Sequence, residues 1–248
     1  MNSDMQDLFD RVFGDLPRQA PGSRTSTLRA FAALPAIPRG ATVLDVGCGG
    51  GGQTRTLADV HDGPVVAIDL MQPFLRRLRS SVDEDGLAIY PVCMSMDRMG
   101  FVDGSFDLIW SEGALYSVGF ERAVSNCRDL LKPGGYLAAS ELVWLTDDRP
   151  EEAVRYFETE YPAMRSRDSV ADLLRGLGFA LIDCFVLPDS DWWDEFYSPL
   201  NDKLDSLHKS FANDETANEF LDAMVVELDV RRRYPDAYGY VFYILNYE

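Results

Sequence analysis

Three glycines and two acids occur at spacings that can hold a nucleoside-containing ligand. The stretch VLDVGCGGGGQT, residues 43–54, carries Gly47, Gly49 and Gly52 in a G-x-G-x-x-G pattern. Such a loop brings backbone N–H groups and a helix N-terminus against a ligand. Asp69 closes the next apolar run, VVAID, 22 residues after Gly47. A carboxylate at this position can accept hydrogen bonds from ribose hydroxyls.

Asp45, two residues before the first glycine, distinguishes between two classes of ligand. Its carboxylate repels the pyrophosphate of NAD and attracts a ligand that carries an ammonium and a sulfonium group. S-adenosylmethionine carries both positive groups and no phosphate. Asp45 therefore favours adenosylmethionine, and a nicotinamide-dependent oxidoreductase is the alternative that the glycine spacing leaves open. A purely structural Asp45, accepting a turn or helix N–H, is the third interpretation.

Composition narrows the function classes further. The chain of 248 residues has 23 Lys and Arg against 41 Asp and Glu, a net charge of −18. Nucleic-acid binding requires clustered basic side chains, so we expect no nucleic-acid partner. We expect neither a membrane span nor a signal peptide, because no apolar run is long enough and the N-terminal residues carry acids without a basic region. The four cysteines and two histidines lack metal-ligand spacing, so we expect no metal. These features predict a cytoplasmic protein, either a monomer or a homodimer.

Apolar runs of strand length alternate with helical patterns through most of the chain. We expect strands at 42–46, 65–69, 88–92, 106–111, 136–142, 180–187 and 239–246, and helices at 52–60, 72–81, 120–131, 151–160 and 169–176. This alternation predicts an α/β fold with a doubly wound, mostly parallel seven-stranded sheet. The KPGG stretch at 132–135 is expected to be a turn before the fifth strand. The carboxyl ends of such strands bring the acids and glycines to one edge.

Two segments add to this sheet within a single domain, residues 1–248. Helical patterns at 3–16 and 25–34 predict an N-terminal helical lid over residues 1–38. Residues 189–236 interrupt the alternation with aromatic-rich helical segments between the last two strands. We interpret them as a helical cap on the sheet.

Several motifs resemble, in order and spacing, those of class I adenosylmethionine-dependent methyltransferases. They are LDVGCGGGGQT, the acid in AIDL, SMDRMGF followed by DGSFDLIWSEGALY, and LLKPGGYLAASE. The sequence most resembles the group related to ubiquinone/menaquinone-biosynthesis and type 11 enzymes. The resemblance implies a Rossmann-like methyltransferase fold. It also implies methyl transfer from adenosylmethionine, with adenosylhomocysteine as product, to O, N or C of a small-molecule acceptor. A non-catalytic protein that binds either nucleoside on the same fold is a further alternative.

The resemblance also implies a set of donor-binding residues. Asp45 lies near the methionine ammonium, the loop backbone approaches the donor, and Asp69 accepts from the ribose hydroxyls. Ser95 stands where many relatives carry an acid for the adenine amino group, and Asp97 is a possible substitute for that acid. The expected donor-binding residues are Asp45, Gly47, Cys48, Gly49, Asp69, Leu70, Met71, Ser95, Met96, Asp97, Glu112 and Gly113.

The sequence contains fewer features that indicate where a methyl acceptor binds. A general base is needed only when the nucleophile arrives protonated. Strand-end positions make Glu112, Tyr116 and Glu141 the candidate catalytic residues, and a buried, hydrogen-bonded Glu141 is the alternative. Aromatic side chains at strand ends and on the cap suit an apolar molecule or a cation, although they can equally pack the cap onto the sheet. The candidate acceptor contacts are Gln19, Ser23, Tyr116, Trp144, Trp192, Trp193, Phe196 and Tyr197.

Overall fold

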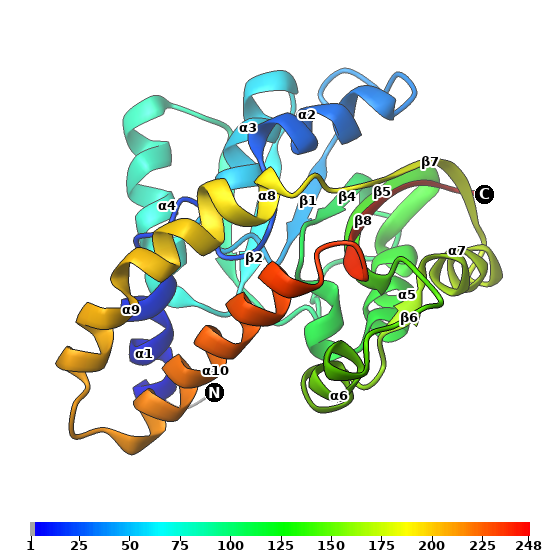
Figure 1. The fold of residues 1–248 in the computed structure, drawn as a ribbon. Coiled ribbons are helices and arrows are strands. Elements are labelled where there is room, and N and C mark those ends of the chain that lie inside the picture. The colour runs from blue at the N-terminus through cyan, green and yellow to red at the C-terminus, as the bar shows by residue number, and fades with distance from the viewer. Residues whose placement is uncertain (1–2) are drawn as a thin grey trace.

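A mixed β-sheet forms the centre of the computed structural model, which describes residues 3–248 (Figure 1). Its strand order is β3-β2-β1-β4-β5-β8-β7, and β6 pairs with β5 beside this path. The strands are β1 (Val43–Val46), β2 (Val65–Asp69), β3 (Ile89–Cys93), β4 (Phe106–Ser111), β5 (Leu131–Trp144), β6 (Arg165–Ser166), β7 (Phe179–Val186) and β8 (Tyr238–Tyr247). All pairs are parallel except those of β8, which runs antiparallel to β5 and β7. The doubly wound, mostly parallel sheet is confirmed, with the two-residue β6 as an additional strand.

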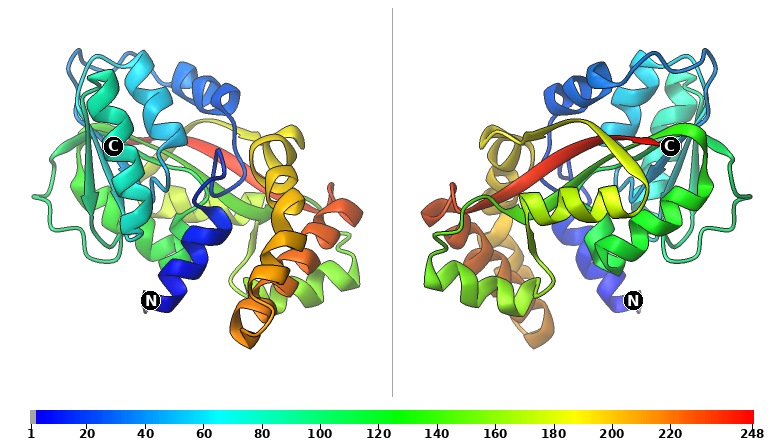
Figure 2. Two further views of the ribbon diagram at one scale, coloured as in Figure 1. Left: turned by 90° about the vertical axis from the view of Figure 1, so that its left-hand side faces the viewer. Right: turned by 90° about the vertical axis from the view of Figure 1, so that its right-hand side faces the viewer.

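Helices cover both faces of this sheet (Figure 2). Helices α2 (Arg24–Ala33), α3 (Gly52–Val60) and α4 (Gln72–Asp85) share one core cluster, and α5 (Phe120–Leu130) and α7 (Arg167–Gly176) share the other. Strand β1 contributes Val43 to the first cluster and Leu44 to the second. Burial on both faces explains why this strand is almost continuously apolar in sequence.

The N-terminal helix packs against a helical insertion between β7 and β8. The insertion contains α8 (Ser190–Trp192), η2 (Trp193–Tyr197), α9 (Ser198–Ser210) and α10 (Glu215–Arg233). Helix α1 (Ser3–Phe13) meets it through aromatic pairs, with ring centroids 5.1 Å apart for Phe9–Phe220 and 6.2 Å apart for Phe13–Phe196. Helix α6 (Glu151–Glu160) follows β5. The helical insertion expected at 189–236 is therefore present, and it reaches across to the start of the chain.

The expected turn at 132–135 is wrong, because these residues belong to β5. Phe106 pairs with Leu131 and Leu108 pairs with Tyr136, so β5 carries a bulge here. Gly134 takes the left-handed backbone, with φ of +77°. Asn246 on β8 donates to the carbonyl oxygens of Gly134 and Gly135 at 3.0 and 3.2 Å. The flanking pairs at Leu131 and Tyr136 and the bonds from the Asn246 side chain thus hold a turn-forming sequence within the strand as a bulge.

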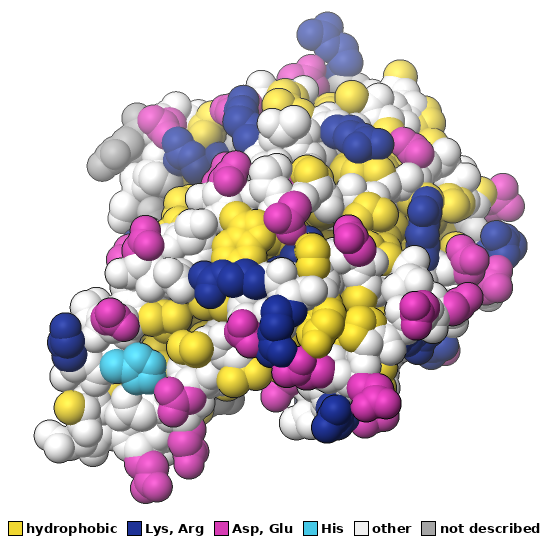
Figure 3. Space-filling model, in the orientation of Figure 1, with side chains coloured by type: hydrophobic (Ala, Val, Ile, Leu, Met, Phe, Trp, Pro, Cys, Tyr) yellow, Lys and Arg dark blue, Asp and Glu magenta, His cyan; other side chains and the backbone are white. Residues whose placement is uncertain are grey.

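The surface in Figure 3 carries basic and acidic side chains interspersed. Over the described part of this face, Lys and Arg do not gather into one patch. Among residues 3–248, no helix combines the length and apolar character required to cross a membrane.

Candidate active site

A cavity of about 440 Å³ lies at the carboxyl ends of β1, β2 and β4. It is the edge of the sheet at which ligands of doubly wound folds bind. The expected donor-binding residues that line it are Gly47, Cys48, Gly49, Asp69, Leu70, Met71, Ser95, Met96, Glu112 and Gly113. We call it the donor cavity, and Asp45 and Asp97 are not part of its wall.

The glycine loop after β1 forms a cradle that larger residues cannot make. Gly47 and Gly49 have φ of +73° and +54°, a region that other residues rarely adopt. A Cβ atom on Gly47 would lie 2.4 Å from the Cβ of Ala114, and one on Gly49 would lie 2.7 Å from Oε1 of Gln19. Between them, Cys48 is buried, and burial raises the pKa of its thiol well above the usual range. The thiol therefore stays protonated and fills space in the turn.

Asp69 is held at the rim of this cradle by backbone donors. Its Oδ2 accepts from Gly49 N at 2.9 Å, and its Oδ1 accepts from Met71 N at 2.8 Å. Each carboxylate oxygen has a further lone pair available. The half-buried side chain lines the donor cavity, where it can accept from a ligand hydroxyl.

Asp45 lies one side chain away from the donor cavity. Its Oδ2 accepts from Thr54 Oγ1 at 2.6 Å, and Gln53 Nε2, on a residue that lines the cavity, lies 3.4 Å from its Oδ1. Burial raises the pKa of Asp45 to about 7, with a further increase from Glu112. Asp45 therefore fixes the start of α3, and the structure does not bring it to the ligand surface.

Asp97 does not line the cavity either, and its carboxylate is paired with a side chain of α5. Its carboxylate lies 2.7 Å from Arg122 on α5. Ser95 Oγ accepts from Asp97 N at 3.2 Å, which closes a local turn. Ser95 and Met96 line the cavity, so an adenine ring would meet a hydroxyl, a thioether and backbone here.

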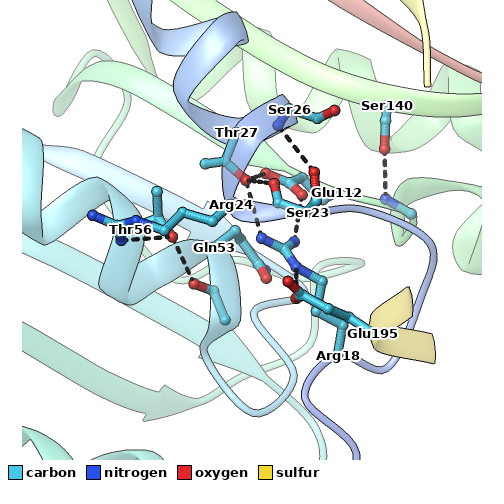
Figure 4. Close-up of polar contacts among 12 residues, drawn as sticks. Arg18, Ser23, Arg24, Ser26, Thr27, Gln53, Thr56, Glu112, Ser140 and Glu195 are labelled. Atoms are coloured by element: carbon cyan, nitrogen blue, oxygen red, sulfur yellow. Dashed lines mark hydrogen bonds and ion pairs between the residues drawn. The ribbon is translucent and has the colours of Figure 1, made fainter. Parts of the chain in front are cut away.

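A buried cluster joins the N-terminal segment, the end of β4 and the insertion (Figure 4). Glu112 accepts from Arg18 at 2.7 Å, from Thr27 Oγ1 at 2.7 Å and from Trp110 Nε1 at 2.9 Å. Arg18 also donates through Nε to Glu195 of η2 at 3.1 Å. Glu112 is thus engaged by three donors, which leaves it poorly suited to act as a general base.

Gln19 fastens the N-terminal segment to the glycine loop. Its Oε1 accepts from Gly50 N at 2.6 Å, while its Nε2 donates to the carbonyl oxygens of Phe13 and Leu16 at 3.2 and 3.1 Å. Gln19 also lines the donor cavity. Ser23 differs, because it caps α2 by accepting from Ser26 N at 3.1 Å and lines no cavity described in this region.

A second cavity of about 200 Å³ adjoins the first, and we call it the aromatic chamber. Of the expected acceptor contacts, Tyr116, Trp192, Phe196 and Tyr197 line the aromatic chamber, as does Gln19. The residues shared by both cavities are Gln19, Ala20, Pro21, Tyr116, Phe196 and Glu227. This shared wall puts the chamber directly beside the donor cavity.

Two expected tryptophan contacts lie outside the chamber wall. Trp144 packs behind it, edge-on to Phe157 with ring centroids 5.4 Å apart. Trp193 lies beneath Arg232, whose guanidinium carbon is 5.1 Å from the ring centroid, and it lines a separate surface hollow. Both are packing residues in this structure.

Glu141 is buried behind the aromatic chamber. Tyr161 donates to its Oε1 at 2.5 Å, and its Oε2 has no hydrogen-bond partner in the described chain. Burial raises the pKa of Glu141 to about 8. Tyr161 lines the chamber and Glu141 does not, so Glu141 can influence a ligand only through Tyr161.

Sequence reasoning missed two charged residues of the site, Arg18 and Glu227. Arg18 is 5% exposed and begins the RQAPGS segment, residues 18–23, between α1 and α2. Glu227 lies in the middle of α10 and lines both cavities, where Tyr197 donates to its Oε1 at 2.5 Å. An acid on a long polar helix carries no sequence signal of this position.

Neither histidine lies in these cavities. His61 contacts the carbonyl oxygen of Ala41 at 2.6 Å, and His208 contacts Asn218 at 3.0 Å. Among the residues described, no group of three His, Cys, Asp or Glu side chains is placed to hold a metal ion.

Comparison with known proteins agrees with this geometry. A family model described as "Methyltransferase domain" matches residues 44–139. O-methyltransferase rstn1 of Aspergillus nomiae is 30% identical over 158 residues, which cover 61% of this chain and 70% of that protein. Rice (Oryza sativa subsp. japonica) 24-methylenesterol C-methyltransferase 2 is 31% identical over 186 residues, which cover 69% of this chain and 50% of that protein. The chain spans about half the length of the first curated relatives that it matches.

Among solved structures, a Geobacter sulfurreducens SAM-dependent methyltransferase in complex with S-adenosyl-L-homocysteine superposes with a TM-score of 0.80. It is 20% identical, and the match covers 96% of this chain and 97% of that chain. This likeness confirms the Rossmann-like methyltransferase fold. The family model and the Aspergillus relative identify the family: this chain belongs to the methyltransferase-domain family.

Proposed function

We propose that this chain transfers a methyl group from S-adenosylmethionine to a small molecule, with the donor in the 440 Å³ cavity. The observation that carries the proposal is the glycine cradle facing Asp69, in a cavity without an unpaired basic side chain among its described lining residues. The cradle gives backbone access and Asp69 gives the ribose acceptor. We also propose that the chain is cytoplasmic. Its four cysteines are free thiols, which supports this location.

The charges around the donor cavity support a positive ligand over a pyrophosphate. Its charged lining residues are Arg18, Asp69, Glu112 and Glu227. Arg18 is already paired with Glu112 and Glu195, so it cannot neutralise a phosphate without leaving two carboxylates unpaired. A ligand with a sulfonium and an ammonium suits the excess of negative charge. This argues against the nicotinamide-dependent alternative.

The residues that line the cavity fit adenosylmethionine, and little chemistry is required of the protein itself. When bound, adenosylmethionine supplies an activated methyl group, so the protein has to orient two ligands and exclude water. The cradle and Asp69 hold the donor, while Tyr116 and Glu227 line both the donor cavity and the aromatic chamber. The names of the rice and Aspergillus relatives, a C- and an O-methyltransferase, support methyl transfer and leave the methylated atom open.

A labelled-methyl assay tests this function. The protein is incubated with adenosylmethionine carrying a radioactive methyl group and with pools of small metabolites, and the labelled product is extracted. We expect at least one pool to become labelled. A protein that binds adenosylhomocysteine and labels no pool would be the non-catalytic alternative on the same fold.

A further inference from the structure

The aromatic chamber has a composition that discriminates by charge. Nine aromatic side chains line it, namely Tyr116, Tyr156, Phe157, Tyr161, Trp192, Phe196, Tyr197, Tyr238 and Tyr240. They come from η1 (Leu115–Val118), α6, α8, η2, β8 and the loop after α6. Aromatic faces attract cations through the ring quadrupole, and a cage built from several directions does so best.

Two carboxylates and no described Lys, Arg or His line the same chamber. Glu160 lies at the end of α6 and Glu227 on α10. The guanidinium groups near the chamber already have carboxylate partners. Arg18 pairs with two carboxylates, and Arg231 stacks on Trp192 at 4.1 Å while it pairs with Asp189 at 2.7 Å. An anionic acceptor would therefore meet negative charge without a compensating positive group.

Glu227 lines both the chamber and the donor cavity. Its Oε1 accepts from Tyr197, a side chain that is 1% exposed. Burial raises the pKa of Glu227, and the nearby Glu160 raises it further. An ionised Glu227 is thus costly without a positive partner, and a cationic ligand supplies one. The partner would lie beside the point where a donor and an acceptor meet.

We propose that the aromatic chamber selects an apolar amine as methyl acceptor and holds its nitrogen, as positive charge develops there, between ring faces and Glu227. This inference rests on the proposed function. The nitrogen lone pair forms the new N–C bond, and the C–S bond of the sulfonium donor breaks with its electron pair moving to sulfur. A tertiary amine becomes a quaternary ammonium without proton loss. A secondary amine yields a tertiary ammonium, whose proton Glu227 can accept.

Three probes of one shape and different charge test the selectivity. Choline is a cation, 3,3-dimethylbutan-1-ol is its neutral isostere, and 3,3-dimethylbutanoate is the anion. Each is titrated into the full chain by ligand-observed NMR, with and without saturating adenosylhomocysteine. We expect choline to bind at least about tenfold more tightly than either other probe, as several ring faces and a carboxylate together provide.

Variants then assign the preference to Glu227. Glu227→Gln should reduce the choline-to-alcohol affinity ratio by roughly tenfold. Glu219→Gln, an exposed acid on the same helix, should leave the ratio unchanged. Equal affinities, tighter binding of the anion or no binding of choline overturns the proposal, and this wild-type comparison decides it even where Glu227→Gln does not fold. Failure to bind adenosylhomocysteine would instead contradict the proposed donor site, whatever the probes show.

Discussion

At the scale of single residues, Asp69 carries the most specific expectation. Asp69→Ala removes the acceptor at the rim of the glycine cradle, together with its bonds from Gly49 N and Met71 N. A charge-assisted hydrogen bond to a buried hydroxyl contributes about 1.5–3 kcal/mol. We expect adenosylhomocysteine affinity, measured by calorimetry, to fall roughly tenfold to a hundredfold. Asp103→Ala, at an exposed loop acid, is the matched control. Unchanged affinity in Asp69→Ala would remove Asp69 from the donor site.

Glu141 gives a pH-dependent stability of unusual sign. Its pKa rises from 4.5 to about 8 on burial, so the folded protein keeps a proton that the unfolded chain releases between these values. Its contribution to stability is therefore full below about pH 4.5 and is lost as pH rises toward 8. One such proton changes the free energy of unfolding by up to about 1.4 kcal/mol per pH unit.

Glu141→Gln should flatten this dependence. Denaturant titrations at pH 5.5, 6.5 and 7.5 should show a shallower loss of stability than in the wild type. Asp45, with its pKa raised to about 7, and Glu227, whose pKa burial also raises, contribute to the slope that is left. Glu158→Gln, on an exposed residue of α6, should retain the full slope. Parallel slopes for wild type and Glu141→Gln would show that Glu141 is ionised in the folded protein.

Most of the residues expected to bind the donor line the larger cavity, and more than half of the expected acceptor contacts line the aromatic chamber. Glycines and acids at strand ends have backbone reasons for their spacing, so Gly47, Gly49 and Asp69 could be placed from sequence. Asp45 was expected at the ligand and lies behind Gln53, because Thr54 and Gln53 occupy its oxygens. Arg18 could not be placed, because its partners Glu112 and Glu195 are 94 and 177 residues away. Such pairs depend on tertiary packing alone.

At the scale of elements, the loop between β1 and α3 depends on close packing as well as on backbone conformation. Gly47→Ala imposes a positive φ on alanine and places its Cβ 2.4 Å from Ala114. Gly40→Ala imposes a φ of +69° with no atom within 4 Å. Strain alone costs about 1–2 kcal/mol. We expect Gly40→Ala to lose only this stability and to keep donor binding.

Gly47→Ala should lose more stability and most donor affinity, because the β4 end must move away from the loop. Thermal unfolding and adenosylhomocysteine titration measure the two effects. Equal behaviour of the two variants would mean that backbone strain, and not the contact with Ala114, sets the requirement for glycine.

The boundaries of a helix or strand could be predicted where local sequence alone determines where the element begins and ends. Helix α6 begins and ends at the expected residues, 151 and 160. Helix α4 extends four residues past its expected end at 81, to the left-handed Gly86. The bulge in β5 was expected to be a turn, because KPGG favours a turn locally, whereas the residues on either side of it, Leu131 and Tyr136, pair with neighbouring strands. Long-range pairing was thus the missing information.

At the scale of the whole molecule, the edge of the sheet forms one side of the two cavities, and the insertion and the N-terminal segment enclose them. Trp192 lines the aromatic chamber, whereas its neighbour Trp193 faces a separate hollow. Trp192→Phe should raise the KM for the acceptor severalfold and leave adenosylhomocysteine affinity unchanged, because the donor cavity does not include it. Trp193→Phe should change neither quantity. Equal loss of donor and acceptor binding in Trp192→Phe would indicate that the ring supports the fold as a whole.

The binding of a sulfonium-type nucleoside at the glycine cradle is the central claim, and one titration tests it most directly. The intact chain is titrated by calorimetry with adenosylhomocysteine and, separately, with NADH at the same concentrations. The arrangement of Gly47, Asp69 and the paired Arg18 predicts saturable binding of adenosylhomocysteine and no detectable binding of NADH. Binding of NADH without binding of adenosylhomocysteine would contradict the account.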